Sequence, residues 1–127
     1  MGDLPSYVKN IAQVYEGIAS QIENLLIVLN DKGMQGHEHQ ILADRINNYL
    51  AAFEQSVRTE GLLVKKLAPD KRKRFLFLLN DQIKQIKRLK TYITISKKKP
   101  TPEIIKAVNE LYTKIREEIA GEEALLK

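Results

Sequence analysis

The chain of 127 residues contains no cysteine. Disulfide bonds, thiolate zinc sites and cysteine nucleophiles are therefore excluded, and the composition fits a reducing compartment. The longest uninterrupted apolar run is LLIVL at 25–29, far below the roughly 20 residues that a membrane-spanning helix needs. The first ten residues, MGDLPSYVKN, hold no apolar segment of the kind found in secretory signals. We therefore expect a cytoplasmic protein without a membrane span.

Glycine and proline are also scarce, with six and four copies, and they lie mainly at the boundaries of apolar-periodic segments. This distribution favours long helices. With 43% hydrophobic and 29% charged residues, the chain has the composition of a globular protein rather than a disordered one. Its length suits one domain, so we expect a single helical domain over residues 1–127.

Apolar residues recur mostly at spacings of three and four in four segments, at about 4–29, 38–68, 70–97 and 102–126, and in the first two the spacings alternate regularly. This alternation is typical of helices packed along partner helices. The sequence therefore predicts an all-α fold, an antiparallel bundle of four long helices joined by short turns. The predicted core positions are Leu4, Val8, Ile11, Tyr15, Ile18, Ile22, Leu25, Leu29, Ile46, Leu50, Phe53, Val57, Glu60, Val64, Leu67, Leu76, Leu79, Ile83, Ile86, Leu89, Ile93, Ile105, Val108, Tyr112, Ile115, Ile119 and Leu126.

Local signals mark where the helices begin and end. Asp3 is a good N-cap for the first helix, and Thr101 followed by Pro102 is a good start for the fourth. Gly61, in the last third of the second segment, costs about 1 kcal/mol relative to alanine in a helix. It predicts either a kink or a short fifth segment at 61–68.

Positive charge is concentrated in one segment. Residues 70–99 hold eleven of the 21 basic residues and two of the 16 acidic ones. At about 100° per residue, most of these cations fall on the helix face opposite the core, along about 39 Å. Phe77 lies near the middle of this face and Tyr92 at its edge, while Lys71, Arg72, Lys90 and Lys97 lie nearer the core or its flanks. The predicted basic face comprises Lys73, Arg74, Lys84, Lys87, Arg88, Lys98 and Lys99.

Three interpretations of the basic face remain open. It is a solvated surface neutralised by glutamates of neighbouring helices, a footprint for nucleic acid, or a surface for an acidic protein or anionic lipid. An aromatic side chain among cations, such as Phe77 or Tyr92, is suited to stacking on an unpaired base. No helix-turn-helix, RNP or zinc-finger spacing is present, so we expect binding of RNA or single-stranded DNA through the backbone.

Other candidate sites are weak. His37 and His39, in GHEH at 36–39, are two residues apart, but a zinc site needs three or four ligands and the sequence offers no second cluster of them. We therefore expect plain surface histidines and no metal or cofactor. No phosphate-binding loop or nucleophile constellation is present, which argues against an enzyme and against a small-molecule substrate. Several acids are expected on solvent-facing surfaces: Glu16, Glu23, Glu54 and Glu110.

MGDLPS matches the pattern for N-myristoylation, and a myristoyl chain with a basic patch would form a two-signal membrane anchor. Viral matrix proteins combine a helical bundle with those two features. The pattern is short, and Asp3 and Pro5 already have a role in starting the first helix.

The first helix carries more apolar residues than one partner helix would cover, namely Leu26, Ile27 and Val28. Either two neighbours flank the helix there, or the three residues form a subunit interface. The sequence thus predicts a non-catalytic component of a larger assembly that contacts nucleic acid and associates with other subunits or with itself. Small basic helical subunits in CRISPR effector complexes have this general character, an analogy of fold alone. The alternative is a protein-only adaptor or chaperone that binds a partner helix in an apolar groove.

Overall fold

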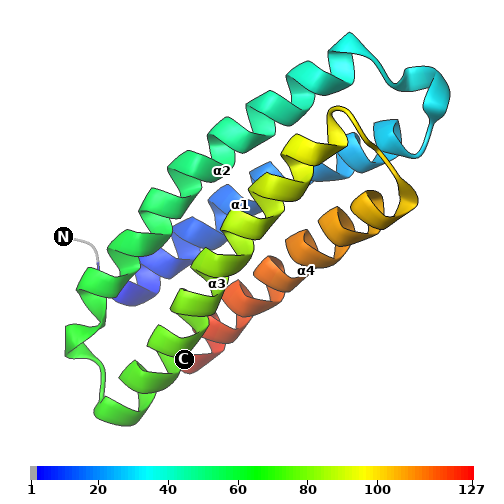
Figure 1. The fold of residues 1–127 in the computed structure, drawn as a ribbon. Helices are drawn as coiled ribbons and strands as arrows, with labels where there is room; N and C mark the ends of the chain where they lie inside the picture. The colour runs from blue at the N-terminus through cyan, green and yellow to red at the C-terminus, as the bar shows by residue number, and fades with distance from the viewer. Residues whose placement is uncertain (1–2) are drawn as a thin grey trace.

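The described chain folds into four long helices, α1 (Leu4–Leu29), α2 (His37–Leu63), α3 (Pro69–Ser96) and α4 (Pro102–Leu125) (Figure 1). Two short 3-10 turns, η1 (Lys32–Met34) and η2 (Val64–Lys66), lie on either side of α2. The structure, a computed structural model, describes residues 3–127 apart from the side chain of Met34. No strand occurs in this range, so the predicted all-α four-helix bundle is confirmed.

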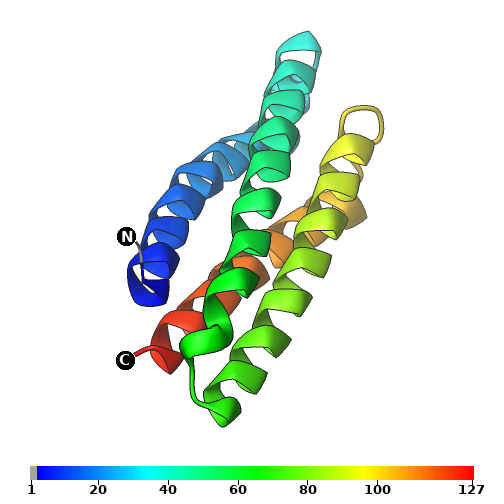
Figure 2. The ribbon, with the colours of Figure 1, turned by 90° about the vertical axis from the view of Figure 1, so that its left-hand side faces the viewer.

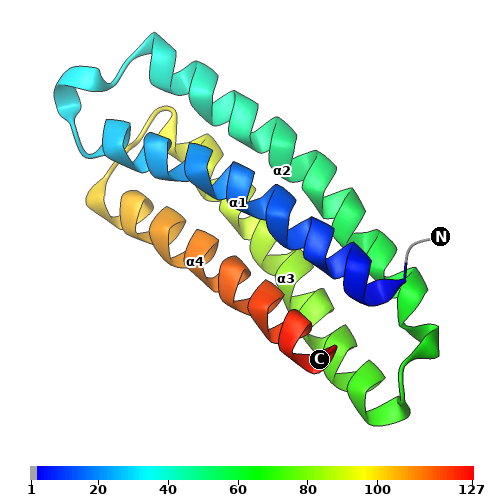
Figure 3. The ribbon, with the colours of Figure 1, turned by 180° about the vertical axis from the view of Figure 1, so that it is seen from behind.

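Each helix packs against two neighbours, in the order α1, α2, α3, α4 and back to α1. Short turns join consecutive helices, which therefore run antiparallel. Helices α2 and α3 face the viewer in Figure 1, and α1 and α4 do so from behind in Figure 3. The α2–α3 pair and the α1–α4 pair consequently lie on opposite sides of the bundle. No helix within residues 3–127 has the length and apolarity required to cross a membrane.

The predicted helix starts are confirmed. The Asp3 carboxylate accepts a hydrogen bond from the backbone N–H of Ser6 (2.9 Å), and the Thr101 hydroxyl accepts one from Ile104 (3.3 Å). Both helices have a proline in the first turn, where its missing N–H is not needed. Gly2, on which the myristoylation pattern depends, lies outside the described residues.

The second helix does not break at Gly61. It continues to Leu63, and the possible fifth segment at 61–68 is reduced to the 3-10 turn Val64–Lys66. Val57 and Val64 are buried on either side of the glycine. Their packing holds Gly61 in helical geometry and outweighs its intrinsic cost of about 1 kcal/mol.

The predicted core is largely confirmed, and all eight predicted positions of α1 are buried. In α3 the buried face is rotated from the predicted one. Leu76 and Ile83 are only half-buried, while Phe75 and Gln82 are fully buried. Gln85 is also buried, at 3% exposed. Apolar periodicity does not predict this rotation, because two of the buried positions hold polar glutamines.

A cluster of polar side chains lies in the core where α2, α3 and α4 meet. Glu60, Gln82 and Glu122 are 0% exposed and Glu118 is 8% exposed. Gly61, which follows Glu60 in the sequence, faces Leu79 of α3, and Gly121, which precedes Glu122, faces Leu78. Glu60 and Glu122 therefore lie at the same height along α3. The cluster therefore forms one layer of the bundle, which we call the buried carboxyl layer: Glu60, Gln82, Glu118 and Glu122.

The carboxyls of this layer favour their protonated form. Both carboxyl oxygens of Glu60 and of Glu122, and both amide atoms of Gln82, have no hydrogen-bond partner within residues 3–127. Burial raises the pKa of Glu60 to about 8 and that of Glu122 to about 9, and in Glu122 the nearby Glu60 and Glu118 add to the increase. Burial likewise raises the pKa of Glu118 to about 8, and its hydrogen bond with Asp81 adds to the shift.

The buried carboxyl layer should make the free energy of unfolding fall as pH rises. Glu60 and Glu122 have a higher pKa in the folded chain, so the unfolded chain loses these protons first, from about pH 4.5 up to about pH 8–9. We expect Glu60→Gln to flatten this decline and to raise the free energy of unfolding at pH 8 by about 2 kcal/mol or more. Urea denaturation at several pH values between about 5 and 8 measures both effects.

The exposed Glu117 of α4 supplies the control. Its charge is the smallest contribution to the raised pKa of Glu118, so Glu117→Gln should leave most of the pH dependence of stability in place. A decline as steep in Glu60→Gln as in the native chain would show that the buried carboxyl is not responsible.

Candidate functional site

All seven cations of the predicted basic face are exposed. Within residues 3–127 none of them lies within ion-pair distance of a carboxylate. Arg88 makes one hydrogen bond, from Nη1 to the side-chain oxygen of Gln85 (3.1 Å), and this partner is uncharged. We call the seven residues the α3 basic face: Lys73, Arg74, Lys84, Lys87, Arg88, Lys98 and Lys99.

Five of the seven cations lie on α3 itself, from Lys73 to Arg88, over about 22 Å at 1.5 Å per residue. The backbone places them there because Phe75, Leu79 and Ile86 are buried on the opposite side of the helix. Figure 2 shows α3 at the edge of the molecule, where its outer side is free of the other three helices.

The last two cations are positioned differently from the prediction. Helix α3 ends at Ser96, so Lys98 and Lys99 lie in the turn to α4. Their backbone N–H groups donate to the carbonyl of Ile95, at 3.1 and 2.9 Å. The helical part of the face is therefore shorter than the predicted 39 Å or so, and the two lysines continue it at the end of the bundle.

The two aromatic residues of the predicted site differ in exposure. Phe77 is 74% exposed and projects among the cations. Tyr92 is half-buried and packs against the core. Phe77 is therefore the side chain with a free aromatic surface.

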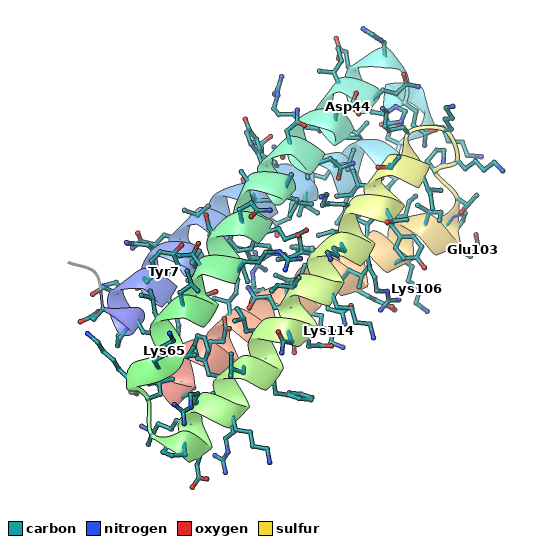
Figure 4. The ribbon with its side chains drawn as sticks, turned by 60° about the vertical axis from the view of Figure 1, so that its left-hand side comes forward. Tyr7, Asp44, Lys65, Glu103, Lys106 and Lys114 are labelled. Carbon is teal, nitrogen blue, oxygen red and sulfur yellow. The ribbon has the colours of Figure 1, made fainter. Side chains whose placement is uncertain are left out.

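Two of the four basic residues at the flanks of α3, Lys90 and Lys97, are paired with carboxylates. Lys97 Nζ is 2.6 Å from Asp44 Oδ1, and Lys90 Nζ is 3.9 Å from Glu54 Oε1. On the other side, Lys114 of α4 lies 3.7 Å from Asp81. Figure 4 shows Asp44 near one end of α2 and Lys114 beside α3. The neighbouring acids thus compensate the flanks of α3, and its outward face keeps its charge.

A hollow of about 410 Å³ lies in the groove between α2 and α3. One lining residue, Arg58 of α2, was not predicted. Its Nε and Nη2 donate to Glu54 Oε2 at 3.1 and 3.0 Å, which fixes the guanidinium beside α3. The four cations and one amide around the hollow are suited to an anion such as a phosphate. The hollow is lined by Arg58, Asn80, Ile83, Lys84, Lys87 and Arg88.

Glu54 itself corrects a prediction, because it is 7% exposed rather than on a solvent-facing surface. Glu54 lies where α2 packs against α3, and its carboxylate pairs with Arg58 of α2 and with Lys90 of α3. The spacing of four between Glu54 and Arg58 is the sequence signal that could have revealed the pair.

A second hollow, of about 750 Å³, lies between α3 and α4. Its apolar part comes from Phe77 and Leu78 of α3 and from Leu125 of α4, and Gly121 forms part of the surface. Lys73, Arg74 and Asp70 complete it. No pattern in one segment predicted this hollow, since it requires α3 and α4 side by side.

The three surplus apolar residues of α1 do not form one surface. Leu26 is half-buried, packs against the core and borders a hollow of about 420 Å³ with residues of α4. Val28 is also half-buried, and Ile27 is 61% exposed. Helix α1 is flanked by both α2 and α4, which was one of the two predicted explanations. Of the proposed partner interface, only Ile27 presents a large free apolar surface.

The prediction of plain surface histidines holds for His37 and is wrong for His39, which is 4% exposed. His39 Nδ1 accepts a hydrogen bond from the Gly36 N–H (2.7 Å), and its Nε2 lies 3.4 Å from the carbonyl oxygen of Ser96. This ring joins the start of α2 to the end of α3. In the part of the chain that the structure describes, no group of three His, Asp or Glu side chains is arranged to hold a metal ion.

Comparison of the chain with models of protein families, with curated proteins and with solved structures finds no match in any of the three.

Proposed function

We propose that the protein is a non-catalytic helical-bundle subunit that binds the backbone of RNA or single-stranded DNA through the α3 basic face. In this proposal it is a small component of a larger nucleoprotein assembly, of the kind that includes CRISPR effector complexes. The observation that carries the proposal is the exposure of seven cations that have no carboxylate partner in residues 3–127.

Electrostatics supports a polyanionic partner at this face. Neutralisation of each phosphate by a lysine or arginine releases condensed counterions, which provides affinity without reading the base sequence. Outside residues 70–99 the chain offers no net positive charge to a polyanion, since it has ten basic and fourteen acidic residues, of which Glu60, Glu118 and Glu122 are protonated near neutral pH. The charge distribution therefore both attracts a nucleic acid and orients it along α3.

The groove between α2 and α3 supports contact with phosphates rather than with bases. Lys84, Lys87 and Arg88 surround its hollow together with Arg58. Arginine in a fixed orientation is well suited to bidentate contact with phosphate oxygens. Such contacts position a strand but carry no sequence information.

Charge reversal tests the proposal. The triple variant Lys84→Glu, Lys87→Glu, Arg88→Glu should lose most of its affinity for a fluorescent single strand of about 20 nucleotides, in anisotropy titrations at about 50 mM salt. The dependence of log affinity on log salt should also become shallower, by about 2 for three lost phosphate contacts.

The matched control reverses three exposed lysines on other elements, Lys9, Lys32 and Lys65. Both triple variants change the formal net charge from +5 to −1, because each reversal removes two charges. The control should retain most of the affinity. If the two variants are equally impaired, net charge rather than the α3 basic face determines binding, and if the native chain binds no strand at all the proposal fails.

Arg58 provides a second test, because its role comes from the structure alone. Arg58→Gln should weaken binding of the same single strand severalfold and lower the salt dependence by about 0.7, the value for one phosphate contact. Arg116 is the control, since it forms a similar pair with Glu16 on the opposite side of the bundle. Arg116→Gln should bind like the native chain, and equal weakening by both substitutions would remove Arg58 from the site.

A further inference from the structure

Phe77 is the most exposed large apolar side chain of the described chain, at 74%. It is on the outward side of α3, so it adds nothing to the core, and leaving such a ring in water is unfavourable. It forms one wall of the hollow of about 750 Å³ between α3 and α4, and Leu78 and Leu125 supply further apolar surface there. This volume is within the range of sites that take small organic groups.

A glycine keeps this hollow open. A Cβ atom at Gly121 would lie 3.3 Å from Leu78 Cδ1, so a larger residue would enter the space between α3 and α4. Glycine at this position destabilises the helix by about 1 kcal/mol relative to alanine. The hollow is therefore a property of the packing of α4 against α3.

Cations border the apolar surface on the α3 side. Lys73 and Arg74 are exposed and have no carboxylate partner within residues 3–127. The third polar lining residue, Asp70, lies in the first turn of α3, where the helix dipole favours a negative charge. A ligand that fits must therefore combine a flat apolar group, directed to Phe77, with negative charge beside it.

We infer that this hollow receives one unstacked base of a single-stranded nucleic acid, with Phe77 as its stacking surface and Lys73 and Arg74 beside the adjoining phosphates. The inference rests on the proposed function and extends it from backbone contacts to a contact with one base. In a duplex the bases are paired and stacked, so Phe77 cannot reach a base face, whereas an unpaired base offers one irrespective of its identity.

Continuity with the α3 basic face favours a nucleic acid over an acidic amphipathic peptide. Lys84 and Arg88 lie on the same side of α3 as Phe77, so a strand seated at the hollow extends directly along further cations. A peptide helix would place its charges on both sides of an apolar face, whereas the cations border this hollow on the α3 side alone.

The test compares Phe77→Ala with the native chain on a single strand of about 20 nucleotides and on its duplex. Loss of the ring should weaken single-strand binding between about fivefold and a hundredfold, and leave duplex binding and the salt dependence unchanged. Phe77→Trp should restore single-strand binding, because an indole ring also stacks on bases.

Leu62 supplies the matched control. It is 72% exposed and borders a surface that also includes Lys65 and Lys66, but it lies on α2 and is not aromatic. Leu62→Ala should bind both nucleic acids like the native chain. A strand of sugar phosphates without bases adds a second control, since it should bind the native chain and Phe77→Ala equally well.

The outcomes separate this inference from the proposed function. Binding that is lost on charge reversal but unchanged in Phe77→Ala overturns the base site and leaves backbone binding intact. Duplex binding weakened as much as single-strand binding, or Phe77→Trp behaving like Phe77→Ala, also overturns it. An acidic amphipathic peptide that binds the native chain through Phe77, when the single strand does not need this residue, would assign the hollow to a protein partner instead.

Discussion

The packing of α3 against α2 and α4 determines which side chains of α3 reach solvent. Phe75, Leu79 and Ile86 are almost completely buried, and exposing one such side chain would cost about 2–3 kcal/mol. Repulsion between neighbouring cations on a helix surface is weaker, on the order of 0.2–0.5 kcal/mol per pair. Core packing therefore overrides charge repulsion, and the burial of one face of α3 places Lys84 and Arg88 together on the other.

The acids of the bundle are distributed so that this charge remains uncompensated. Asp44 and Glu54, on α2, are positioned at the flank of α3, where they pair with Lys97 and Lys90. Such pairs contribute little to stability when they are exposed to solvent. Their consequence here is for the electrostatic field, because these carboxylates of α2 are already engaged and the outward cations remain available to a ligand. Neutralisation by neighbouring glutamates thus describes the flanks of α3 and does not describe its outer face.

The sequence was sufficient for the helices, for most of the core and for the exposure of the basic residues, because all three follow from local periodicity. It was insufficient for features that depend on the position of a second helix. Arg58 joins the site only because α2 lies beside α3, and the hollow at Phe77 exists only because Gly121 of α4 faces Leu78. The burial of His39 was not predicted because it depends on the end of α3, where the ring lies against the Ser96 carbonyl.

The buried carboxyl layer escaped prediction for a related reason. Glu60 falls on the predicted core positions of the second segment, but Glu118 and Glu122 look like ordinary surface acids when α4 is considered alone. They are buried because the faces of α2, α3 and α4 that hold them converge. Hydrophobic periodicity identifies apolar residues in a core and is uninformative about polar ones, which are tolerated there at a cost.

The buried carboxyl layer also bears on the charge that a ligand meets. The formal net charge of +5 counts all 16 acids as ionised. Burial raises the pKa of Glu60, Glu118 and Glu122 to about 8 or 9, so near neutral pH these three carboxyls are protonated and the net charge is closer to +8. The core behind this part of α3 is thus neutral, although its sequence is acidic. Ionised carboxylates at this depth would act through a medium of low dielectric and would weaken the field of the cations outside. The burial that lowers the stability of the bundle at high pH therefore also means that these three carboxyls do not weaken the field of the α3 basic face at neutral pH.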